Sequence, residues 1–499
     1  MSTSMSMSMS MSAALPDVAP APATASLADD AGADPAAAVA RAIDAGLAAP
    51  GMMDAARFAA FLDAQVRLGL THGRRPLCRH LRPLVISEQT YDAIARASAE
   101  IGAALERVAA RALVDPAVAD QLGLTADERA LAAIDPGYPQ PLALGRFDML
   151  LNEKTRHFHF IELNADSPAG LADQVLVEKT LMALPHVQEV CRRAPVRTPA
   201  PHRAILDVLR QLYTAWGGRA SRPAIAIVDW TSADTAPELR VLAELFTAEG
   251  HLTRIADPGE LRYDGRRLTA GSMPVDLVYR RVIVHELLAR GGLDHPLIRA
   301  YRDGAVCVAN SFRTKALNKK AAFAVLSDPT FADLFTPAQR AAVAAHIPWT
   351  RRVGPDLLEL LRTHPEDFVL KPNDEYGGKG VILGWRATPA EWERALAGWA
   401  TAPLIAQARC PPTTTRMPTF EAEGDAPGRI AHQDVYFDLC PFLFAGHMEG
   451  AMVRLSSAPV SNVSAGGGVS GLLIVGVGAG AGGAPDHRSA LACGEAPDV

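Results

Sequence analysis

Apolar positions along the first part of the chain recur at two different periods. Over residues 88–113 they return every three or four positions, as on one face of an α-helix, and residues 38–72 also read as helical. The apolar positions of segment 88–113 are Ile94, Ile101, Leu105, Val108 and Leu113. From residue 145 the pattern changes to two strands, 145–151 and 157–163, around the turn Asn152-Glu153-Lys154. The pattern therefore predicts helices followed by a β-hairpin.

The middle of the chain alternates between strand and helix. A helix predicted over 172–184 is followed by a proline-rich linker that ends near residue 201. The elements predicted beyond the linker are a strand at 224–230, a helix at 236–249, and strands at 275–279 and 305–308. Alternation of this kind is typical of an α/β unit with a parallel sheet.

The last third of the chain surrounds a glycine-rich loop. The predicted elements are a helical segment at 313–327, strands at 368–372, 381–385 and 404–407, a helix at 389–399, and long strands near 430–444 and 448–456. Residues 410–428, which are rich in Pro, Thr and Gly, are expected to form a loop.

Composition narrows the class of protein. Of 499 residues, 49% are apolar and 21% charged, as in a globular protein, and the net charge of -6 argues against a nucleic-acid binder. The Ser/Met-rich segment 1–36 lacks the features of a secretory signal and is expected to be disordered, and 476–499 is expected to be a flexible tail. No apolar run is long enough to span a bilayer, and no two of the six cysteines have CxxC spacing. A cytoplasmic protein without membrane or nucleic-acid partners is expected, while the oligomeric state stays open.

One face of the predicted hairpin collects groups that bind divalent cations. Side chains alternate faces along a strand, so Arg146 shares a face with Asp148, and Glu162 shares a face with Asn164. If the strands pair, two carboxylates, an amide oxygen and a guanidinium come together, a set that suits Mg²⁺ and phosphate. The alternative is a half-exposed hairpin with solvated charges. Apolar Phe158 and Phe160 on the Glu162 face favour the metal site.

A second segment has the features of a phosphate-binding loop. A predicted buried strand delivers Lys371 and then opens into Gly377, Gly378, Lys379 and Gly380. Glycines permit positive φ and let backbone N–H groups converge on an anion, which Lys371 can also reach. The GxxxxGK[ST] pattern of a P-loop is absent. A hairpin turn with solvated lysines is the alternative, but the apolar flanking strands favour phosphate binding.

Two further segments supply weaker candidates for nucleotide contacts. Gln407 ends an apolar strand and is placed to meet an adenine edge. Lys315, Lys319 and Lys320 lie in a helical segment, where a lysine is usually solvated, and the sequence does not decide which of them contacts a nucleotide.

Together these segments resemble the ATP-grasp family. The sequence RFDxL…ELNADSP and the order of the motifs, hairpin before glycine loop, are similar to circularly permuted members, including the synthetase domain of glutathionylspermidine synthetase. VDLVYRR at 275–281 is similar to their pre-ATP-grasp domain, although Ala408 stands where many relatives have Glu. No separate cysteine amidase domain is visible before the hairpin.

The resemblance implies a fold and a division of the chain. The implied fold class is α/β with two α+β lobes, a circularly permuted ATP-grasp with an inserted pre-ATP-grasp domain and disordered termini. The implied units are a disordered segment at 1–36, a helical region with the hairpin at 37–200, the pre-ATP-grasp domain at 201–312, the nucleotide lobe with closing strands at 313–475, and a tail at 476–499.

The resemblance also implies roles for the candidate residues. The implied set is ATP with Mg²⁺ as cofactors, Asp148, Glu162 and Asn164 as metal ligands, Arg146 as the catalytic arginine, and Lys319, Lys371, Gly377, Gly378, Lys379, Gly380 and Gln407 at the nucleotide. A substrate carboxylate, from a small molecule or a peptide, would attack the γ-phosphate, and an amine would capture the acyl phosphate. A phosphotransferase and a nucleotide-binding protein without turnover are the alternatives.

The acid substrate has one candidate site. The strand predicted at 275–279 ends in Arg280 and Arg281, at the edge where open α/β sheets bind ligands. Either arginine is expected to hold a substrate carboxylate, with a surface salt bridge as an equally weighted alternative.

Overall fold

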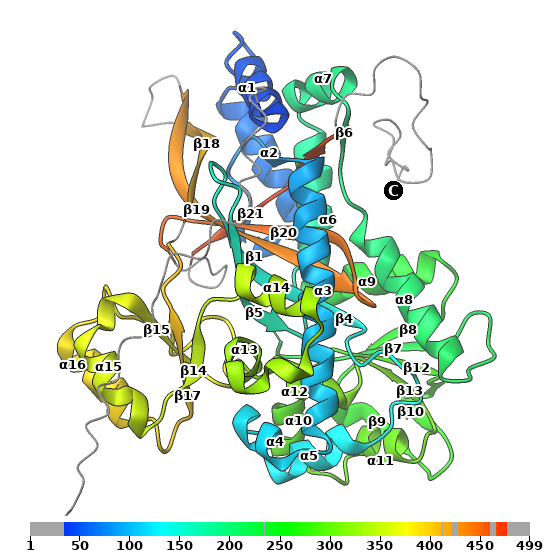
Figure 1. Ribbon diagram of the computed structural model, residues 1–499. Coiled ribbons are helices and arrows are strands. Elements are labelled where there is room, and N and C mark those ends of the chain that lie inside the picture. The colour runs from blue at the N-terminus through cyan, green and yellow to red at the C-terminus, as the bar shows by residue number, and fades with distance from the viewer. Residues whose placement is uncertain (1–33, 234, 412, 422–427, 460–465, 477–499) are drawn as a thin grey trace, which may run out of the picture.

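The central element of the fold is a six-stranded, antiparallel sheet. A computed structural model describes residues 34–233, 235–411, 413–421, 428–459 and 466–476. The order of the central sheet is β21-β20-β19-β4-β5, with β18 also paired to β19 (Figure 1). Its strands are β4 (Leu144–Leu151), β5 (Phe158–Asn164), β18 (Thr414–Glu421), β19 (Arg429–Phe444), β20 (His447–Ser456) and β21 (Gly468–Ser470). Strands from the middle and the end of the chain thus form one sheet.

The predicted hairpin is confirmed, and the structure supplies its register, which the sequence left open. β4 and β5 pair antiparallel, with Arg146 opposite Asn164 and Asp148 opposite Glu162. A register shift follows Asp148, between it and Met149. The four polar residues therefore lie in adjacent pairs at one end of the hairpin, beside β19.

The long predicted helix is α3 (Glu88–Ala112), which packs against the central sheet. Ser87 caps its N-terminus by accepting a hydrogen bond from the Thr90 N–H at 3.2 Å. Its buried positions follow the helical period predicted from the sequence. The segment 38–72 forms two helices, α1 (Pro35–Leu47) and α2 (Ala55–Leu68), because Pro50 and Gly51 interrupt it.

The predicted α/β unit is also confirmed. A parallel sheet of order β13-β12-β7-β8 is flanked by helices (Figure 1). Its elements are α8 (Pro201–Ala215), β7 (Ile225–Val228), α9 (Ala236–Ala248), β8 (Thr253–Ala256), β12 (Leu277–Arg280), α10 (Val284–Gly291), α11 (Pro296–Arg302) and β13 (Cys307–Ala309). The exact domain boundaries at 200 and 312 stay predictions.

The glycine loop belongs to a separate antiparallel sheet of order β14-β17-β15-β16. Its elements are β14 (Thr350–Arg352), α15 (Leu358–Thr363), β15 (Phe368–Pro372), β16 (Ile382–Leu383), α16 (Pro389–Ala397) and β17 (Leu404–Ala408). A small core that contains Leu361, Leu370 and Trp392 holds the two helices on this sheet. This lobe projects from the rest of the molecule in Figure 1.

Two expectations from the sequence were wrong. The helical segment 313–327 is split into α12 (Lys315–Asn318) and α13 (Ala321–Ser327), because Lys319 has an extended ψ of 128°. The expected loop 410–428 contains β18, which pairs with β19 over eight positions. Pro418 is tolerated there because β18 is an edge strand, where a missing N–H leaves no ladder partner unsatisfied.

The other elements are shorter or lie at the periphery. A third sheet has the order β3-β22-β6. The remaining helices and strands are α4 (Pro116–Leu122), α5 (Ala126–Ala133), α6 (Leu171–Met182), α7 (Pro185–Arg193), α14 (Pro337–His346), β1 (Thr71–His72), β2 (Arg75–Pro76), β3 (Leu84–Ser87), β6 (Val196–Arg197), β9 (Leu261–Tyr263), β10 (Leu268–Ala270), β11 (Met273–Pro274) and β22 (Leu472–Val475), with short 3₁₀ turns at Pro258–Glu260, Phe312–Thr314, Pro329–Leu334, Pro355–Leu357 and Pro365–Asp367.

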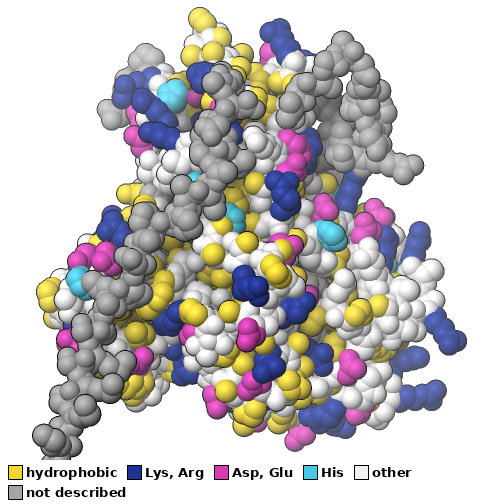
Figure 2. Space-filling view, in the orientation of Figure 1, with side chains coloured by type: hydrophobic (Ala, Val, Ile, Leu, Met, Phe, Trp, Pro, Cys, Tyr) yellow, Lys and Arg dark blue, Asp and Glu magenta, His cyan; other side chains and the backbone are white. Residues whose placement is uncertain are grey.

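The described surface carries charges of both signs. On the face in Figure 2, basic and acidic side chains are interspersed over the part that the described residues occupy. None of the helices within the described ranges is both long and apolar enough to pass through a bilayer. The segments expected to be disordered or flexible, 1–36 and 476–499, lie almost entirely outside the described residues.

Stability should fall with rising pH because of one buried acid. Burial raises the pKa of Glu178 from its ordinary value of 4.5 to about 8, despite hydrogen bonds from Gln174 and the Leu472 N–H. A raised carboxyl pKa means that its stabilising contribution is complete below pH 4.5 and is lost as pH rises through 8. A shift of this size corresponds to a loss of up to about 5 kcal/mol in the free energy of unfolding.

Glu178→Gln keeps the same hydrogen-bond acceptor without a titrating proton. Thermal unfolding between pH 5 and pH 9 should show a smaller loss of melting temperature in this variant than in the wild type. The exposed Glu244→Gln is the matched control and should follow the wild type. Parallel pH profiles for all three proteins would contradict the assignment to Glu178.

Candidate functional site

A cavity lies between the β4–β5 hairpin and the sheet of the glycine-loop lobe. We call it the inter-lobe cavity. Its apolar wall consists of Leu150, Ile161, Val369, Leu383 and Trp385. Its polar wall contains Arg146, Asp148, Glu162, Asn164, Lys320, Lys371, Gly377, Gly378, Lys379, Gln407, Asp438 and Arg454. Most of the residues predicted from the two motifs therefore line one space, although they are more than 200 positions apart in the sequence.

The hairpin face is organised by the carboxylate of Asp148. Arg146 donates from Nε to Asp148 Oδ1 at 3.1 Å and from a terminal nitrogen to the Ala169 carbonyl at 2.6 Å. Asn164 Nδ2 donates to the same Asp148 oxygen at 3.2 Å. These bonds orient the Arg146 guanidinium and the Asn164 amide along the wall of the cavity.

Two residues of this face were missed in the sequence. Arg454 of β20 donates to Asp148 Oδ2 and to Asp438 Oδ2, both at 2.9 Å. Asp438 and Arg454 lie directly opposite each other on β19 and β20. The sequence does contain a signal for both residues, since each is a single charged residue within an otherwise apolar strand segment. Burial alone would raise the pKa of Asp148, but Arg146 and Arg454 together lower it, so this carboxylate stays ionised.

Glu162 and Asn164 are the hairpin groups best placed to hold a metal ion. The Glu162 carboxylate lies 3.6 Å from Lys320 Nζ, and both residues line the cavity. Because the Asn164 amide nitrogen is turned toward Asp148, its oxygen is left as an acceptor. Both Asp148 oxygens already accept hydrogen bonds from arginines. Of the three predicted ligands, Asp148 therefore has the oxygens least available to a metal ion. The donor set consists of hard oxygens and fits Mg²⁺.

Lys371 links the glycine-loop lobe to the hairpin. Its Nζ donates to the Ile161 carbonyl of β5 at 3.1 Å and to Gln407 Oε1 at 2.8 Å. The Gln407 amide is held in turn, since its Nε2 donates to Thr350 Oγ1 at 3.1 Å. Burial lowers the pKa of Lys371, while the nearby Glu162 opposes that effect. An anion in the cavity would compensate this buried ammonium group, and Gln407 positions it.

The glycine loop has the backbone conformation that its sequence predicts. Gly377, Gly378 and Gly380 have φ of 65°, 73° and 70°, in the left-handed region where a side chain is strained. Gly377, Gly378 and Lys379 line the inter-lobe cavity, and the Lys379 ammonium lies 4.8 Å from the centre of the Tyr376 ring. Gly380 lies beyond the wall, where an added Cβ would come within 2.7 Å of Pro372.

Of the three candidate lysines, Lys320 faces the cavity and Lys319 does not. Lys319 is buried and bonds to Glu128 at 3.0 Å and to Asp374 at 2.7 Å. Lys315 is also buried and bonds to Asp374 at 2.6 Å. The predicted nucleotide role of Lys319 therefore conflicts with its position, because the break between α12 and α13 turns neighbouring lysines in different directions.

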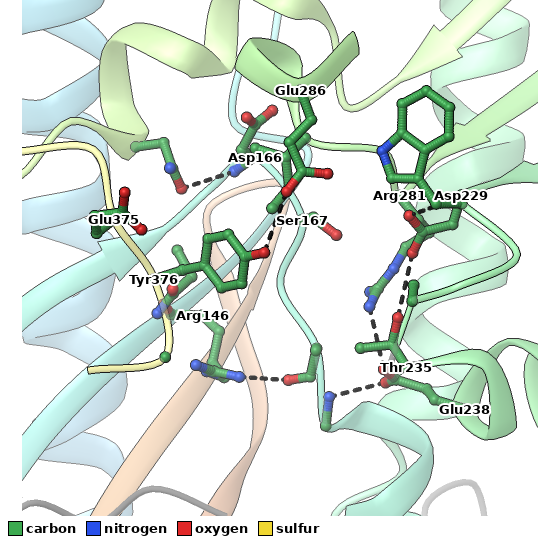
Figure 3. A pocket seen from close by; sticks show the side chains of 18 of the residues that line it. Arg146, Asp166, Ser167, Asp229, Thr235, Glu238, Arg281, Glu286, Glu375 and Tyr376 are labelled. Atoms are coloured by element: carbon green, nitrogen blue, oxygen red, sulfur yellow. Dashed lines mark hydrogen bonds and ion pairs between the residues drawn. The ribbon is translucent and has the colours of Figure 1, made fainter. Parts of the chain in front are cut away.

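A second cavity, the central cleft, adjoins the first and encloses about 430 Å³. The two cavities share a wall that includes Arg146, Glu162, Asn164, Lys320 and Arg454. The far side of the cleft is formed by the α/β unit, with Asp229, Thr235, Glu238 and Arg281 opposite Arg146 (Figure 3). A group held at the shared wall is thus accessible from both cavities.

The glycine loop reaches across this cleft to the α/β unit. The Tyr376 hydroxyl donates to Glu286 Oε1 of α10 at 3.1 Å (Figure 3). Asp374, two residues before Tyr376, lies 3.9 Å from His285 Nδ1. The loop therefore contacts two consecutive residues of α10 and partly covers the cleft.

The two arginines predicted to bind a substrate acid already form hydrogen bonds and ion pairs within the protein. Arg280 lies outside both cavities and uses its donors on Asp166, Thr314 Oγ1 and the carbonyls of Val282, Asn310 and Ser311. Arg281 lines the cleft but pairs with Glu238 at 3.1 Å and bonds to the Pro168 carbonyl. The expectation of a free arginine for a carboxylate conflicts with these contacts, because both side chains serve as internal counter-ions.

Comparisons with known proteins identify the fold. No protein-family model matches the chain. A Frankia alni protein that carries the name glutamate–cysteine ligase 2-3 is 29% identical over 181 residues. That alignment covers 34% of this chain and 20% of the relative, so the chain spans only about a fifth of that protein.

Solved structures extend the likeness over most of the chain. A glutathione synthetase-like effector of Globodera pallida, in its apo form, overlays with a TM-score of 0.52 at 12% identity, over 85% of this chain and 99% of that chain. A RimK-domain ATP-grasp protein of Sphaerobacter thermophilus overlays with a TM-score of only 0.26 at 17% identity, over 50% of this chain and 90% of that chain. The mixed α/β fold is confirmed, whereas the ATP-grasp assignment and the circular permutation stay predictions.

The different surroundings of Lys319 and Lys320 predict different defects. Lys320→Ala should weaken the binding of a non-hydrolysable ATP analogue by about ten- to a hundredfold, which corresponds to the loss of one charge-assisted hydrogen bond. The melting temperature should change little. Lys319→Ala should destabilise the fold by roughly 3 kcal/mol, because it leaves buried carboxylates short of a cation.

Calorimetric titration and thermal unfolding of both variants check this assignment. Lys154→Ala, an exposed lysine of the hairpin turn, is the control and should affect neither quantity. Normal analogue affinity in Lys320→Ala together with a wild-type melting temperature in Lys319→Ala would contradict both placements.

Proposed function

We propose that the protein is an ATP- and magnesium-dependent carboxylate–amine ligase that forms a carbon–nitrogen bond through an acyl phosphate. The observation that carries this proposal is the wall shared by the two cavities. On one side of it lie the lysines, the glycine loop and an apolar surface, which suit a nucleotide. On the other side lies a polar cleft that suits the substrates.

The inter-lobe cavity has the features required of a nucleotide site. Leu150, Val369 and Leu383 offer apolar surface to a base, and Lys320 and Lys371 offer charge to phosphates. Positive φ at Gly377 and Gly378 lets backbone N–H groups approach an anion without side-chain interference. The nucleotide would therefore lie with its phosphates toward the hairpin.

The hairpin face would support transfer of the terminal phosphoryl group. Asp148 accepts hydrogen bonds from Arg146 and Arg454. Both guanidinium groups are therefore already held at the shared wall before a phosphate binds. Fixed cations at the point where charge develops are the main catalytic need of phosphoryl transfer. Magnesium, held by Glu162 and Asn164 with Asp148 behind them, would neutralise phosphate charge when bound.

The second step would take place from the central cleft. An acid substrate at the shared wall receives the phosphoryl group, and its activated carbonyl then faces the cleft, from which an amine attacks. The contact between Tyr376 and Glu286 would hold the glycine loop over the cleft and keep water from the acyl phosphate. The name of the Frankia alni relative makes glutamate and cysteine the first acid and amine to test.

A hydroxylamine assay tests the proposal directly. Amino acids and short dicarboxylic acids are incubated with ATP, Mg²⁺ and hydroxylamine, and hydroxamate and ADP are measured. A ligase should give a hydroxamate with at least one acid. ADP without hydroxamate, with the phosphate retained on the acceptor, would indicate a phosphotransferase, and no ADP with any acid would indicate a nucleotide-binding protein without turnover.

Loss of the Glu162 charge should abolish turnover without loss of the fold. Glu162→Gln keeps the size and polarity of the side chain, and we expect kcat for ADP formation to fall at least about a hundredfold. Glu244→Gln is the control, and the melting temperature should stay near that of the wild type in both variants. Wild-type turnover of Glu162→Gln at saturating ATP and magnesium would remove Glu162 from the reaction.

Loss of the Tyr376 hydroxyl should uncouple hydrolysis from synthesis. Tyr376→Phe removes the bond to Glu286, worth about 1 kcal/mol, so the ratio of phosphate released to amide formed should rise about fivefold. Tyr436→Phe, a tyrosine of β19 outside both cavities, is the control. An unchanged ratio would show that this bond does not exclude water.

A further inference from the structure

The far side of the central cleft coincides with the switch point of the parallel sheet. The chain passes from β7 outward to β8 and then crosses to β12 on the other side of β7. Ligands of open α/β sheets bind outside the carboxyl ends of strands at such a point. Here Asp229 follows β7, Arg281 follows β12, and both line the cleft.

The positive charge at this switch point is already compensated. Arg281 pairs with Glu238 Oε2, and the other Glu238 oxygen accepts from the N–H groups of Gly170 and Leu171 at the start of α6. The guanidinium of Arg290 lies 4.0 Å from the centre of the Trp230 ring. The Arg281 Nε is buried without a hydrogen-bond partner among the described residues. The charge of Arg281 is therefore already balanced by Glu238, and that of Arg290 lies over an aromatic ring.

Two carboxylates of the cleft have no ion pair within the described ranges, although the charge of Arg281 acts on both. Asp173, in the first turn of α6, lines the cleft and has no hydrogen bond or ion pair to another described residue. Asp229 is buried and accepts from the Trp230 N–H at 2.9 Å and from Thr235 Oγ1 at 3.2 Å, with no ion pair within the described ranges. Neither carboxylate is therefore balanced by an ion pair of its own.

The ionisation of both groups agrees with this contact pattern. Burial, and then the charge of Glu238, raise the pKa of Asp173 to about 7, against the opposing effect of Arg281. Burial also raises the pKa of Asp229. A bound cation would relieve both penalties, and a carboxylate with a pKa near neutrality is suited to exchange a proton.

We propose that Asp173 and Asp229 bind the amine substrate as its ammonium ion, and that Asp173 then accepts the proton that must leave before attack. This inference rests on the proposed ligase function and adds the site and the charge state of the amine. Asp229 faces Arg146 across the cleft (Figure 3), and Asp173 lines the same cleft, so the nitrogen would approach the shared wall from the side opposite the nucleotide.

Amide formation removes two protons from the nitrogen. The ammonium group gives one proton to the Asp173 carboxylate and becomes a neutral amine. Its lone pair forms the C–N bond with the acyl carbon, while the C–O bond to phosphate breaks and the phosphate leaves with that electron pair. The departing phosphate takes the second nitrogen proton and becomes hydrogen phosphate, and Asp173 returns its proton to solvent.

Competition between two nucleophiles tests the inference. Methylamine is a cation at pH 7, whereas hydroxylamine is largely uncharged and has less need of a carboxylate partner. With the acid that gives the most hydroxamate, Asp173→Asn should lower the ratio of methylamide to hydroxamate by about ten- to a hundredfold, the value of a charge-assisted bond. Asp173→Glu should restore part of the ratio, and exposed Asp63→Asn should match the wild type.

The outcomes separate this inference from the proposed function. If Asp173→Asn fails to fold, the ratio of methylamide to hydroxamate is measured with Asp229→Asn instead, and the melting temperature checks that this variant is folded. A wild-type ratio in a folded variant overturns the inference while leaving the ligase intact. A rise in the Michaelis constant of the acid with an unchanged ratio also overturns it, because the carboxylates would then bind the acid substrate. Absence of hydroxamate with every acid overturns both.

Discussion

The candidate site depends on how the chain compensates two carboxylates that face each other across a hairpin. Asp148 and Glu162 are directly opposite on β4 and β5, an arrangement that is unfavourable for like charges and more so when buried. Arg146 from the same strand and Arg454 from β20 hold the Asp148 charge. Glu162 is thereby left as the carboxylate of the hairpin that both cavities share. The face forms only when the central sheet has assembled.

A second group of buried charges sets the position of the glycine loop. Asp374 bonds to Lys315 and Lys319, and both lysines also lie within ion-pair distance of Glu128. Burial would raise the pKa of Asp374, but the two lysines lower it, so the pair of charges persists in the folded state. The start of the loop is anchored, and conformational freedom is confined to the glycines that follow.

The central cleft is asymmetric in charge. The cations Arg146, Lys320 and Arg454 gather at the wall shared with the inter-lobe cavity, while the carboxylates without counter-ions lie on the α/β side. Separation of this kind would orient the proposed reaction between an anionic acyl phosphate and a cationic amine, since each would be drawn to a different wall. The same separation costs stability in the absence of ligands, because half-buried Asp173 and buried Asp229 have no ion pair of their own within the described ranges.

The sequence by itself determined the elements and the local geometry of the site. Side-chain alternation placed Arg146 with Asp148, and Glu162 with Asn164, because the two-residue period of a strand depends on no distant contact. The glycine loop was also evident, since positive φ is a local property of glycine.

Only the tertiary structure decided which charges are free. Lys319 and Lys320 are adjacent in sequence, yet one is buried in ion pairs and the other faces the cavities, because the helix breaks between them. Arg281 became a counter-ion through Glu238, which is 43 positions away, and Arg454 joined the hairpin from 306 positions away. The partner of a charged side chain is set by packing between distant segments, which no local pattern in the sequence encodes.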